Sequence, residues 1–281
     1  MKLRLGVRGM MWLTLVIMMW GIISCRTQEE KCLEEVLSLP LANKEELQKV
    51  LDHYKDDSLK YQAVCFLIRN MPFHAGYEGN VLKHYYQYFD IYAQGKLGPH
   101  EVIDSLKENS FSVSQLKRIE DIANIDSSLL VQNVDWAFKV WREQPWGKNV
   151  SFDNFCEFVL PYRLGDEPLG FWREDIYKRY NPILDSIRLL PQAQDPLVAA
   201  KVLMDSLVVE QSHFTGLFPA GPHLGPSVVS WRAGSCREFA DLVVYVMRAL
   251  GIPCGTDYMA MRGDNNVPHF WNFTLDKDGK T

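Results

Sequence analysis

The sequence lacks the cysteine and histidine patterns that mark several common classes of protein. None of its six cysteines shows CxxC spacing, and no His/Cys cluster has the spacing of zinc ligands, so no structural metal is expected. No segment repeats at a fixed period, which argues against a solenoid. Lys and Arg total 30 against 35 Asp and Glu, and the formal net charge of −5 argues against nucleic acid as a partner.

A hydrophobic run long enough to cross a membrane is also missing. The apolar run Met10–Ile23 is too short and too isolated for a membrane-spanning helix. Because Lys2, Arg4 and Arg8 precede it, the run is typical of a secretory signal, which we place at residues 1–24. The chain has 281 residues, of which 47% are hydrophobic, and this is ample for a packed globular core.

The end of this segment, Ile22-Ile23-Ser24-Cys25, resembles the lipobox of bacterial lipoproteins. The resemblance implies that Cys25 is lipidated and anchors the chain to a membrane of the bacterial cell envelope, at its periplasmic face or at the cell surface. The alternative is an ordinary signal peptide followed by a chance cysteine. Cleavage before Cys25 removes three positive charges and no negative ones, which takes the formal charge from −5 to −8. Residues 25–42 are then expected to form a tether.

The cysteines that remain are odd in number, which leaves at least one thiol unpaired in an oxidising compartment. They are Cys32, Cys65, Cys156, Cys236 and Cys254. A reactive thiol is the natural candidate for the unpaired one.

Residues 43–194 are expected to form a mostly helical N-terminal region. Asn43 and Glu46 have the spacing of a capping box, and apolar residues then recur at helical spacing. No alternating strand pattern interrupts the region. Further helices are predicted from Ser58 and at about residues 78–93, 114–124, 127–142 and 151–160, the last with Ser151 as its N-cap.

Two features of this region have both a binding and a structural interpretation. Its dense aromatic residues could line a groove for sugar or peptide, but aromatic residues at helical spacing are more often packed in a core. The segment Leu160–Pro168 breaks the helical pattern. Its charged residues and Arg173 could clamp a substrate, although a charged latch between two helical layers is the simpler interpretation.

Residues 195–281 begin with another predicted helix, after which the composition of the chain changes. A loop rich in proline and glycine, at residues 216–226, precedes Gly234-Ser235-Cys236. The apolar residues from Phe239 to Leu250 then follow helical spacing and predict one buried face of an amphipathic helix. Cys236 therefore falls in the first turn of this helix.

The start of a helix suits a nucleophilic cysteine. Unpaired backbone N–H groups and the helix dipole favour the thiolate, which is the reactive form, and the same N–H groups can receive an oxyanion. His213 and His223 lie near the preceding loop, but neither lies in a predicted strand that would hold the imidazole ring in a fixed orientation.

The residues after this helix predict antiparallel strands. Gly251 and Pro253 end the helix, and strands are expected at residues 256–261 and 269–275. A hairpin-turn signal at residues 277–280 predicts a further strand from about Thr281. The chain as a whole is therefore expected to be α+β, with Cys236 on a helix and His269 on a strand.

These motifs resemble those of a known family. Three segments carry the likeness in order, namely Gly-Ser-Cys-Arg-Glu-Phe-Ala at 234–240, Met-Arg-Ala-Leu-Gly-Ile-Pro at 247–253 and His-Phe-Trp-Asn at 269–272. They are similar to the transglutaminase-like superfamily of papain-fold cysteine enzymes, over residues 231–275. The resemblance implies an incomplete papain-like core with Cys236 as nucleophile and His269 as general base.

The resemblance also implies groups that are less clearly placed. The family's third catalytic residue, an aspartate that orients the histidine, would fall just beyond Thr281, so the core is expected to be truncated. Asp276 and Asp278 are weak candidates, because the predicted turn points them to water. Trp231 is the nearest candidate for a side chain that helps the oxyanion. Departures from the family at Phe273, and at Cys254-Gly255, bear on substrate preference.

The sequence thus predicts a membrane-anchored cysteine hydrolase or acyltransferase that acts on an amide bond of a peptide or protein substrate, without a cofactor. Hydrolysis of a peptide is favoured over transamidation. The alternative is a catalytically inactive transglutaminase-like fold that serves as a binding or assembly protein of the cell envelope.

Overall fold

A computed structural model describes residues 28–281, except 109–112, 211–212, 215–220 and 265. The predicted signal segment 1–24 and the predicted lipidation site Cys25 lie outside the described residues. Within the described ranges, no helix has both the length and the apolar character needed to cross a bilayer.

The N-terminal half is mostly helical, as the sequence predicts, and begins with a helix at residues 28–37. The longer elements that follow are α2 Lys44–His53, α3 Ser58–Asn70, β1 Ala75–Glu78, α4 Asn80–Ala93, α5 Pro99–Glu108, β2 Lys117–Glu120, α6 Asp121–Asn124, α7 Ser127–Glu143 and α8 Phe152–Phe158. Short 3-10 helices join them at η1 Met71–Phe73, η2 Val113–Gln115 and η3 Pro145–Asn149.

The C-terminal half mixes helices with short strands. Its elements are α9 Arg173–Tyr180, η4 Asn181–Leu184, η5 Pro191–Gln194, α10 Pro196–Glu210, β3 His213–Phe214, η6 Gly225–Ser227, α11 Val228–Trp231, β4 Ala233–Gly234, α12 Cys236–Ala249, β5 Cys254–Met259 and β6 His269–Thr274. The strands form three two-stranded sheets, of which β1–β2 and β5–β6 are antiparallel and β3–β4 is parallel. The fold is therefore mixed α+β, with far more helix than strand.

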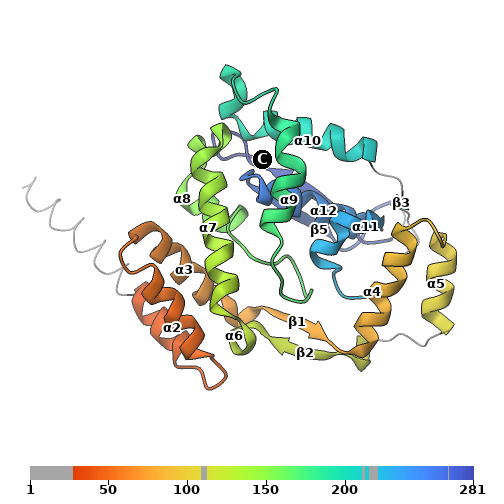
Figure 1. The fold of residues 1–281 in the computed structure, drawn as a ribbon, viewed down its shortest axis with the longest axis horizontal. Coiled ribbons are helices and arrows are strands. Elements are labelled where there is room, and N and C mark those ends of the chain that lie inside the picture. Colours follow the sequence, from red (N-terminus) through yellow and green to blue (C-terminus); the bar gives the residue numbers. More distant parts are fainter. Residues whose placement is uncertain (1–27, 109–112, 211–212, 215–220, 265) are drawn as a thin grey trace, which may run out of the picture.

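The β1–β2 sheet differs from the expectation for the N-terminal region. Residues 114–124 were predicted as one helix, but Lys117–Glu120 forms β2 and only α6 is helical after η2. The strand forms because it pairs with β1, some forty residues earlier in the chain, with Ile119 opposite Gly76. Such distant pairing has no local signature, and Figure 1 shows the two strands running between the α2–α3–α7 helices and the α4–α5 helices.

Helix caps follow the sequence in some places and not in others. Ser151 accepts a hydrogen bond from the Asn154 N–H and caps α8, as predicted. The predicted capping box of Asn43 and Glu46 is wrong, because the Asn43 side chain makes no cap. Glu46 instead accepts the N–H of Ser127 at 2.9 Å and so satisfies the start of α7.

Two hydrophobic clusters hold the molecule together. One joins α2, α3, α7 and α8, and residues 28–42, expected as part of a tether, contribute the buried Val36 to it. The other gathers α9, α10, α11 and α12 and also takes in Tyr85 and Phe89 of α4. The aromatic side chains of α4 are thus largely packed in a core, and the second cluster draws on both sides of the boundary expected near residue 194.

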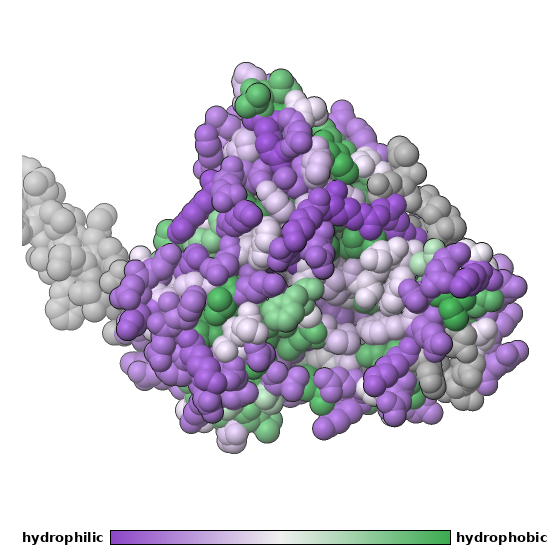
Figure 2. Space-filling view, in the orientation of Figure 1, coloured by the Kyte–Doolittle hydropathy of each residue, from purple (hydrophilic) through white to green (hydrophobic). Residues whose placement is uncertain are grey.

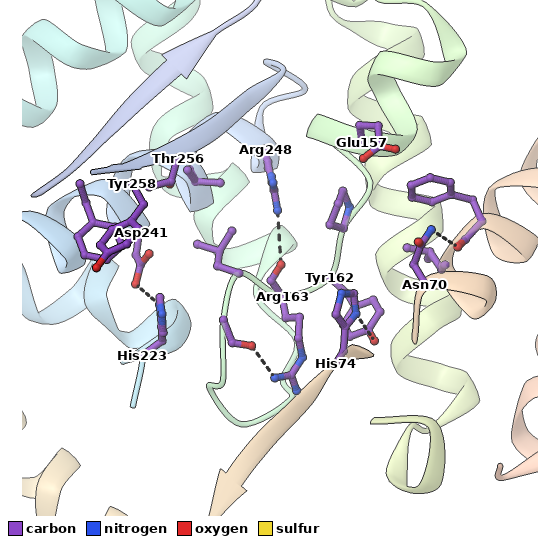
Figure 3. A pocket seen from close by; sticks show the side chains of 17 residues that line it. Asn70, His74, Glu157, Tyr162, Arg163, His223, Asp241, Arg248, Thr256 and Tyr258 are labelled. Atoms are coloured by element: carbon purple, nitrogen blue, oxygen red, sulfur yellow. Dashed lines mark hydrogen bonds and ion pairs between the residues drawn. The ribbon is translucent and has the colours of Figure 1, made fainter. Parts of the chain in front are cut away.

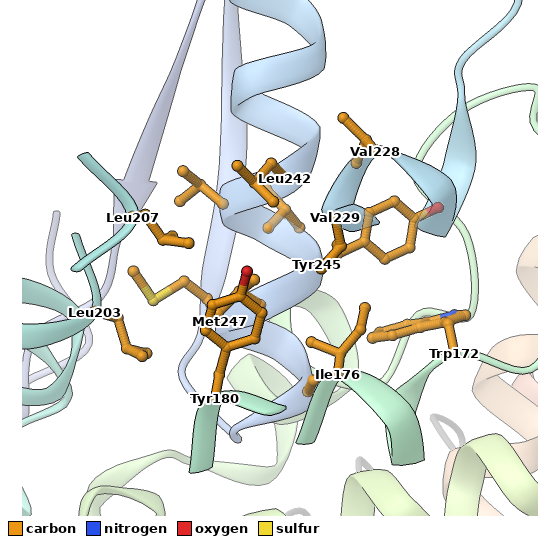
Figure 4. Packing of buried hydrophobic residues seen from close by; sticks show 14 of the residues in the cluster. Trp172, Ile176, Tyr180, Leu203, Leu207, Val228, Val229, Leu242, Tyr245 and Met247 are labelled. Atoms are coloured by element: carbon orange, nitrogen blue, oxygen red, sulfur yellow. The ribbon is translucent and has the colours of Figure 1, made fainter. Parts of the chain in front are cut away.

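Helix α12 lies at the centre of the second cluster (Figure 4). Trp172 and Ile176 pack against it near Tyr245, and Leu203 and Leu207 of α10 pack near Met247. Nearly every side chain of α12 from Glu238 onward is buried, including the charged Glu238, Asp241 and Arg248. The face shown in Figure 2 is by contrast covered mostly by hydrophilic side chains, broken by small apolar patches.

Candidate functional site

Cys236 is the first residue of α12, where the sequence predicts it. Ser235 precedes it as the N-cap, and a capping box closes the helix start. The Glu238 carboxylate accepts the N–H of Ser235 at 2.8 Å and its hydroxyl at 2.6 Å, and the Arg237 guanidinium donates to the same carboxylate at 2.6 Å. Burial alone would raise the pKa of Glu238, but Arg237 and Ser235 lower it below its usual value.

Gly234 is required for this arrangement. Its φ of +139° is rarely adopted by residues with a side chain, and a Cβ there would lie 2.3 Å from the Glu238 Cβ. The Glu238 side chain can fold back over the helix start because nothing projects from residue 234.

Cys236 itself is half-buried and free. Among the described residues, neither its thiol nor its backbone N–H has a hydrogen-bond partner. An N–H without an acceptor at the start of a helix is suited to receive a negatively charged oxygen. The start of α12 therefore offers a thiol and an N–H donor on one residue.

The other cysteines have different surroundings. All five described cysteines are free, and burial raises the pKa of Cys65 to about 11, of Cys156 to about 12 and of Cys254 to about 11. Thiols of this kind are protonated and inert at neutral pH. Cys32, Cys65 and Cys236 are half-buried, whereas Cys156 and Cys254 are buried.

His269 is the first residue of β6, and the direction of this strand brings it to the same end of α12 as Cys236. The Asn272 side-chain amide donates to the Ala240 carbonyl, one turn into α12, at 3.0 Å. Further along, the Leu275 N–H donates to the Pro253 carbonyl, beyond the end of α12, at 3.2 Å. The strand thus runs in the same direction as the helix.

The alternation of side chains along β6 bears on where the His269 ring points. Asn272 faces α12, so His269 and Trp271 belong to the opposite face of the strand, and their rings lie 5.8 Å apart. Among the described residues, no hydrogen bond joins His269 to Cys236. The structure therefore brings the two residues to one end of α12 without joining their side chains.

The other residues predicted for the site are engaged elsewhere. Trp231 stacks on Phe89 with ring centroids 5.4 Å apart and is only 9% exposed. Asp276 accepts the N–H groups of Asp278 and Lys280 within the final turn, each at 2.9 Å. These N–H groups, first that of Lys280, lower the pKa of Asp276. Asp278 is exposed, as the predicted turn implies.

His223 has a partner that the sequence did not reveal. Its Nδ1 lies 2.8 Å from Oδ2 of Asp241, and its backbone N–H donates to Asp166 at 2.7 Å. A Cβ on Gly165 would lie 2.4 Å from the imidazole ring, so this glycine makes room for the ring. Burial alone would lower the pKa of His223, but the hydrogen bond and charge of Asp241 raise it.

The ring of His223 is thus held in place by a carboxylate on α12 rather than by a strand, contrary to the sequence-based argument. One signal was present in the sequence. Asp241 lies in the middle of the apolar stretch Phe239–Met247, and a carboxylate on the buried face of a helix requires a partner. What the sequence lacks is the identity of that partner, since residue 223 lies in an irregular loop.

A cavity of about 540 Å³ lies beside this pair, between the N-terminal helices and the α12–β5–β6 unit (Figure 3). The polar residues that line it include His74, Tyr162, His223, Asp241 and Arg248, and the apolar ones include Phe66, Leu164 and Phe270. Its volume is in the range of small-molecule sites. Neither Cys236 nor His269 lines it.

The charged residues of the 160–173 segment form a buried network next to this cavity. Arg163 pairs with Asp121 at 2.7 Å, and Tyr162 donates to the same carboxylate at 2.8 Å. Glu167 accepts the Tyr245 hydroxyl at 2.7 Å. Arg173 donates to Asn133 and to four backbone carbonyls. These residues link the N-terminal helices to α12, which is the latch interpretation rather than the clamp.

No group of three or more His, Cys, Asp or Glu residues within the described ranges is placed to hold a metal ion. The chain matches no family model, no curated protein and no solved structure.

Proposed function

We propose that the protein is a cysteine hydrolase or acyltransferase that acts on peptide or other amide bonds, with a transglutaminase-like, papain-type core. The observation that carries the proposal is the position of Cys236, a half-buried free cysteine at the start of α12 with an N–H that has no acceptor among the described residues. Helix starts favour thiolate and oxyanion alike.

In the proposed reaction, the Cys236 thiolate attacks the amide carbonyl carbon and the Cys236 N–H binds the resulting oxyanion. His269 gives a proton to the leaving amine as the C–N bond breaks, which leaves a thioester on Cys236. Water, activated by the same imidazole, then releases the acid and regenerates the thiol. The His269 ring must turn toward α12 for these steps, because its strand position faces away. Hydrolysis of a peptide is the version we favour.

The proposal is tested by the reactivity of each cysteine. We expect iodoacetamide at neutral pH to alkylate Cys236 in the full chain about tenfold faster than Cys32, as measured by peptide mass spectrometry. Cys65, Cys156 and Cys254, whose pKa values burial raises, serve as internal controls and are expected to react slowest. Equal rates at Cys236 and Cys32 would contradict an activated nucleophile.

The role of His269 requires a second measurement. His269→Gln is expected to slow acylation of Cys236 by an activated ester. His100→Gln, on the exposed surface of α5, is the matched control and should leave the rate unchanged. An unchanged rate in both variants would remove His269 from the mechanism.

The arrangement of β6 also favours a second candidate function, a noncatalytic binding or assembly protein of the cell envelope. His269 lies on the face of its strand opposite α12, and the cavity beside His223 does not include Cys236. Ligand binding that persists in Cys236→Ala, together with ordinary thiol reactivity in the wild type, would support this function over catalysis.

We also propose that lipidation at Cys25 anchors the protein to a membrane of the bacterial cell envelope. The proposal rests on the Ile-Ile-Ser-Cys motif alone. Expression in bacteria with labelled palmitate should label the wild type and not Cys25→Ala, and the variant should leave the membrane fraction. Equal membrane association of the two would contradict the anchor.

A further inference from the structure

We propose that the cavity beside α12 binds a ligand carboxylate on Arg248, with an apolar body of the ligand packed against the cavity wall. This binding site is separate from the Cys236 thiol and does not depend on the function proposed for it. The inference rests on the way in which Arg248 is buried, on the charges around it and on the character of the cavity.

Arg248 is 8% exposed, yet no carboxylate pairs with it within the described ranges. Its Nε donates to the Phe158 carbonyl at 3.1 Å and to the Cys254 carbonyl at 3.4 Å, and Nη1 donates to the Arg163 carbonyl at 3.4 Å. Nη2 has no acceptor in the part of the chain that the structure describes. A buried cation in this condition retains unused donors on its outer edge.

The neighbouring Arg173 shows what a fully satisfied arginine looks like in this core. Its guanidinium donates to the Asn133 amide and to the carbonyls of four further residues, at 2.6 to 3.1 Å. It does not line the cavity, whereas Arg248 does. Burial lowers the pKa of both side chains, and the charge of Arg248 lowers the pKa of Arg173 further. Of these two buried arginines, only Arg248 lines the cavity, and only Arg248 has a guanidinium nitrogen without an acceptor among the described residues.

The balance of buried charge points the same way. Arg163, Arg173 and Arg248 are buried here, against the carboxylates of Asp121 and Glu167. The remaining buried acid of this region, Asp241, is matched by His223. With His223 protonated, this region holds one more buried positive charge than negative charges, and a buried charge is costly unless it is paired. A bound anion would supply the missing partner.

Among anions, a carboxylate fits this site better than a phosphate. The free edge of a guanidinium presents parallel N–H donors that match the two oxygens of a carboxylate. Asp241 and Glu157 also line the cavity and would repel a dianion. Figure 3 shows Arg248 between the His223–Asp241 pair and the His74–Tyr162 pair, so polar groups flank the cation on both sides.

The rest of the wall suits an apolar body. Phe66, Leu164, Val244 and Phe270 line the cavity together with the exposed Tyr258 and Thr256 of β5. A volume of about 540 Å³ accommodates a ligand the size of an N-acylated amino acid or a short peptide end. We therefore assign the site to a carboxylate carried by a small peptide-like ligand.

The test is calorimetric titration of the full chain with N-acetylphenylalanine and with N-acetylphenylalaninamide, which differ only in the carboxylate. We expect the acid to bind about tenfold more tightly or better. N-acetylglutamate α-amide, whose only carboxylate is in its side chain, distinguishes a peptide C-terminus from an acidic side chain as the source. Equal affinity for the acid and the amide, or no binding of either at millimolar concentration, would overturn the proposal.

Variants locate the site. Arg248→Met keeps the side-chain volume, removes the charge and is expected to lower the affinity for the acid to that of the amide. Arg262→Met, at an exposed pair with Asp264, is the matched control and should bind as the wild type does. Because Arg248→Met could disturb the core, Thr256→Trp provides a second variant that narrows the cavity from an exposed strand position and should weaken binding about tenfold.

Binding of inorganic phosphate as tight as that of N-acetylphenylalanine would overturn the assignment to a carboxylate. Cys236→Ala is expected to bind the acid as the wild type does, so a failure of the proposed catalysis leaves this result unaffected. Loss of binding in Cys236→Ala would place the ligand at the thiol and overturn the separate site.

Discussion

The two ends of α12 bury charge in opposite ways. At its start, Glu238 is 1% exposed and lies 2.6 Å from Arg237, with the Ser235 hydroxyl and N–H on the same carboxylate. Near its end, Arg248 is also buried, at 8% exposed, but donates only to backbone carbonyls, at 3.1 to 3.4 Å. The buried charge at the start of α12 is paired with an opposite charge, and the buried charge near its end has no such partner among the described residues.

This difference separates structure from binding on one helix. A paired and fully hydrogen-bonded charge holds the helix start in one conformation, which positions Cys236. An incompletely bonded charge beside a cavity stabilises the fold less and retains donors for a ligand.

Removal of the Glu238 carboxylate at the start of α12 should have the largest effect on stability. Glu238→Ala removes the cap of α12 and leaves the Arg237 guanidinium without its partner, so we expect the free energy of unfolding to fall by about 3 kcal/mol. Urea unfolding measures this. Glu174→Ala removes a carboxylate from an exposed i,i+4 pair with Lys178 and should show no measurable loss. Similar losses in the two variants would mean that burial of the first pair is unimportant.

A change of backbone at the same end should cost less. Gly234→Ala places a methyl group 2.3 Å from the Glu238 Cβ at a φ of +139°, and we expect a loss of about 2 kcal/mol in unfolding free energy. It should also slow alkylation of Cys236, because the helix start shifts. The control is Gly170→Ala, where the added methyl meets nothing within 4 Å. A silent Gly234→Ala would show that the capping box tolerates displacement.

The Asp241 carboxylate lies between Glu238 and Arg248 on α12. The stability that its pair with His223 contributes should depend on pH. The folded pKa of His223 lies above its ordinary value of 6.5, so the stability it contributes is fully present below about 6.5 and is lost as pH rises through the folded pKa. At acid pH the stability that the pair contributes is lost when Asp241 takes up a proton. Burial raises the pKa of this carboxyl above 3.8.

We therefore expect His223→Gln to lower the unfolding free energy by about 1.5 kcal/mol near pH 6 and by less at pH values well above the folded pKa of His223. Urea titrations of wild type and variant across this range measure the difference. A difference that grows as pH rises would reverse the sign and would show that the imidazole is neutral in the folded protein.

Removal of the Arg248 charge near the end of α12 should have the smallest effect on stability. Arg248→Met removes a buried cation but also leaves three weakly bonded carbonyls, and these opposing changes should keep the unfolding free energy within about 1 kcal/mol of the wild type. Arg173→Met, which abandons five closer acceptors, is the contrasting variant and should be clearly more destabilising. Equal losses would make Arg248 a structural residue like Arg173.

Several elements of the fold were predictable because their causes are local. The spacing of Phe239 to Leu250 predicted α12, and Gly251, with a φ of +77°, ends it as expected. The antiparallel pairing of the last two strands also followed from nearby residues. The β1–β2 pairing did not, because Ala75–Glu78 and Lys117–Glu120 lie far apart in the chain and stabilise each other only once they meet.

The sequence by itself determined that Cys236 lies at the start of α12, since a helix N-terminus is a local property of Gly-Ser-Cys followed by an apolar helical pattern. Only the tertiary structure decided which charges are paired. His223 meets Asp241, Arg163 meets Asp121 and Arg248 meets no acid among the described residues, because partners and burial arise when distant segments pack together. The same packing encloses the cavity that Arg248 lines.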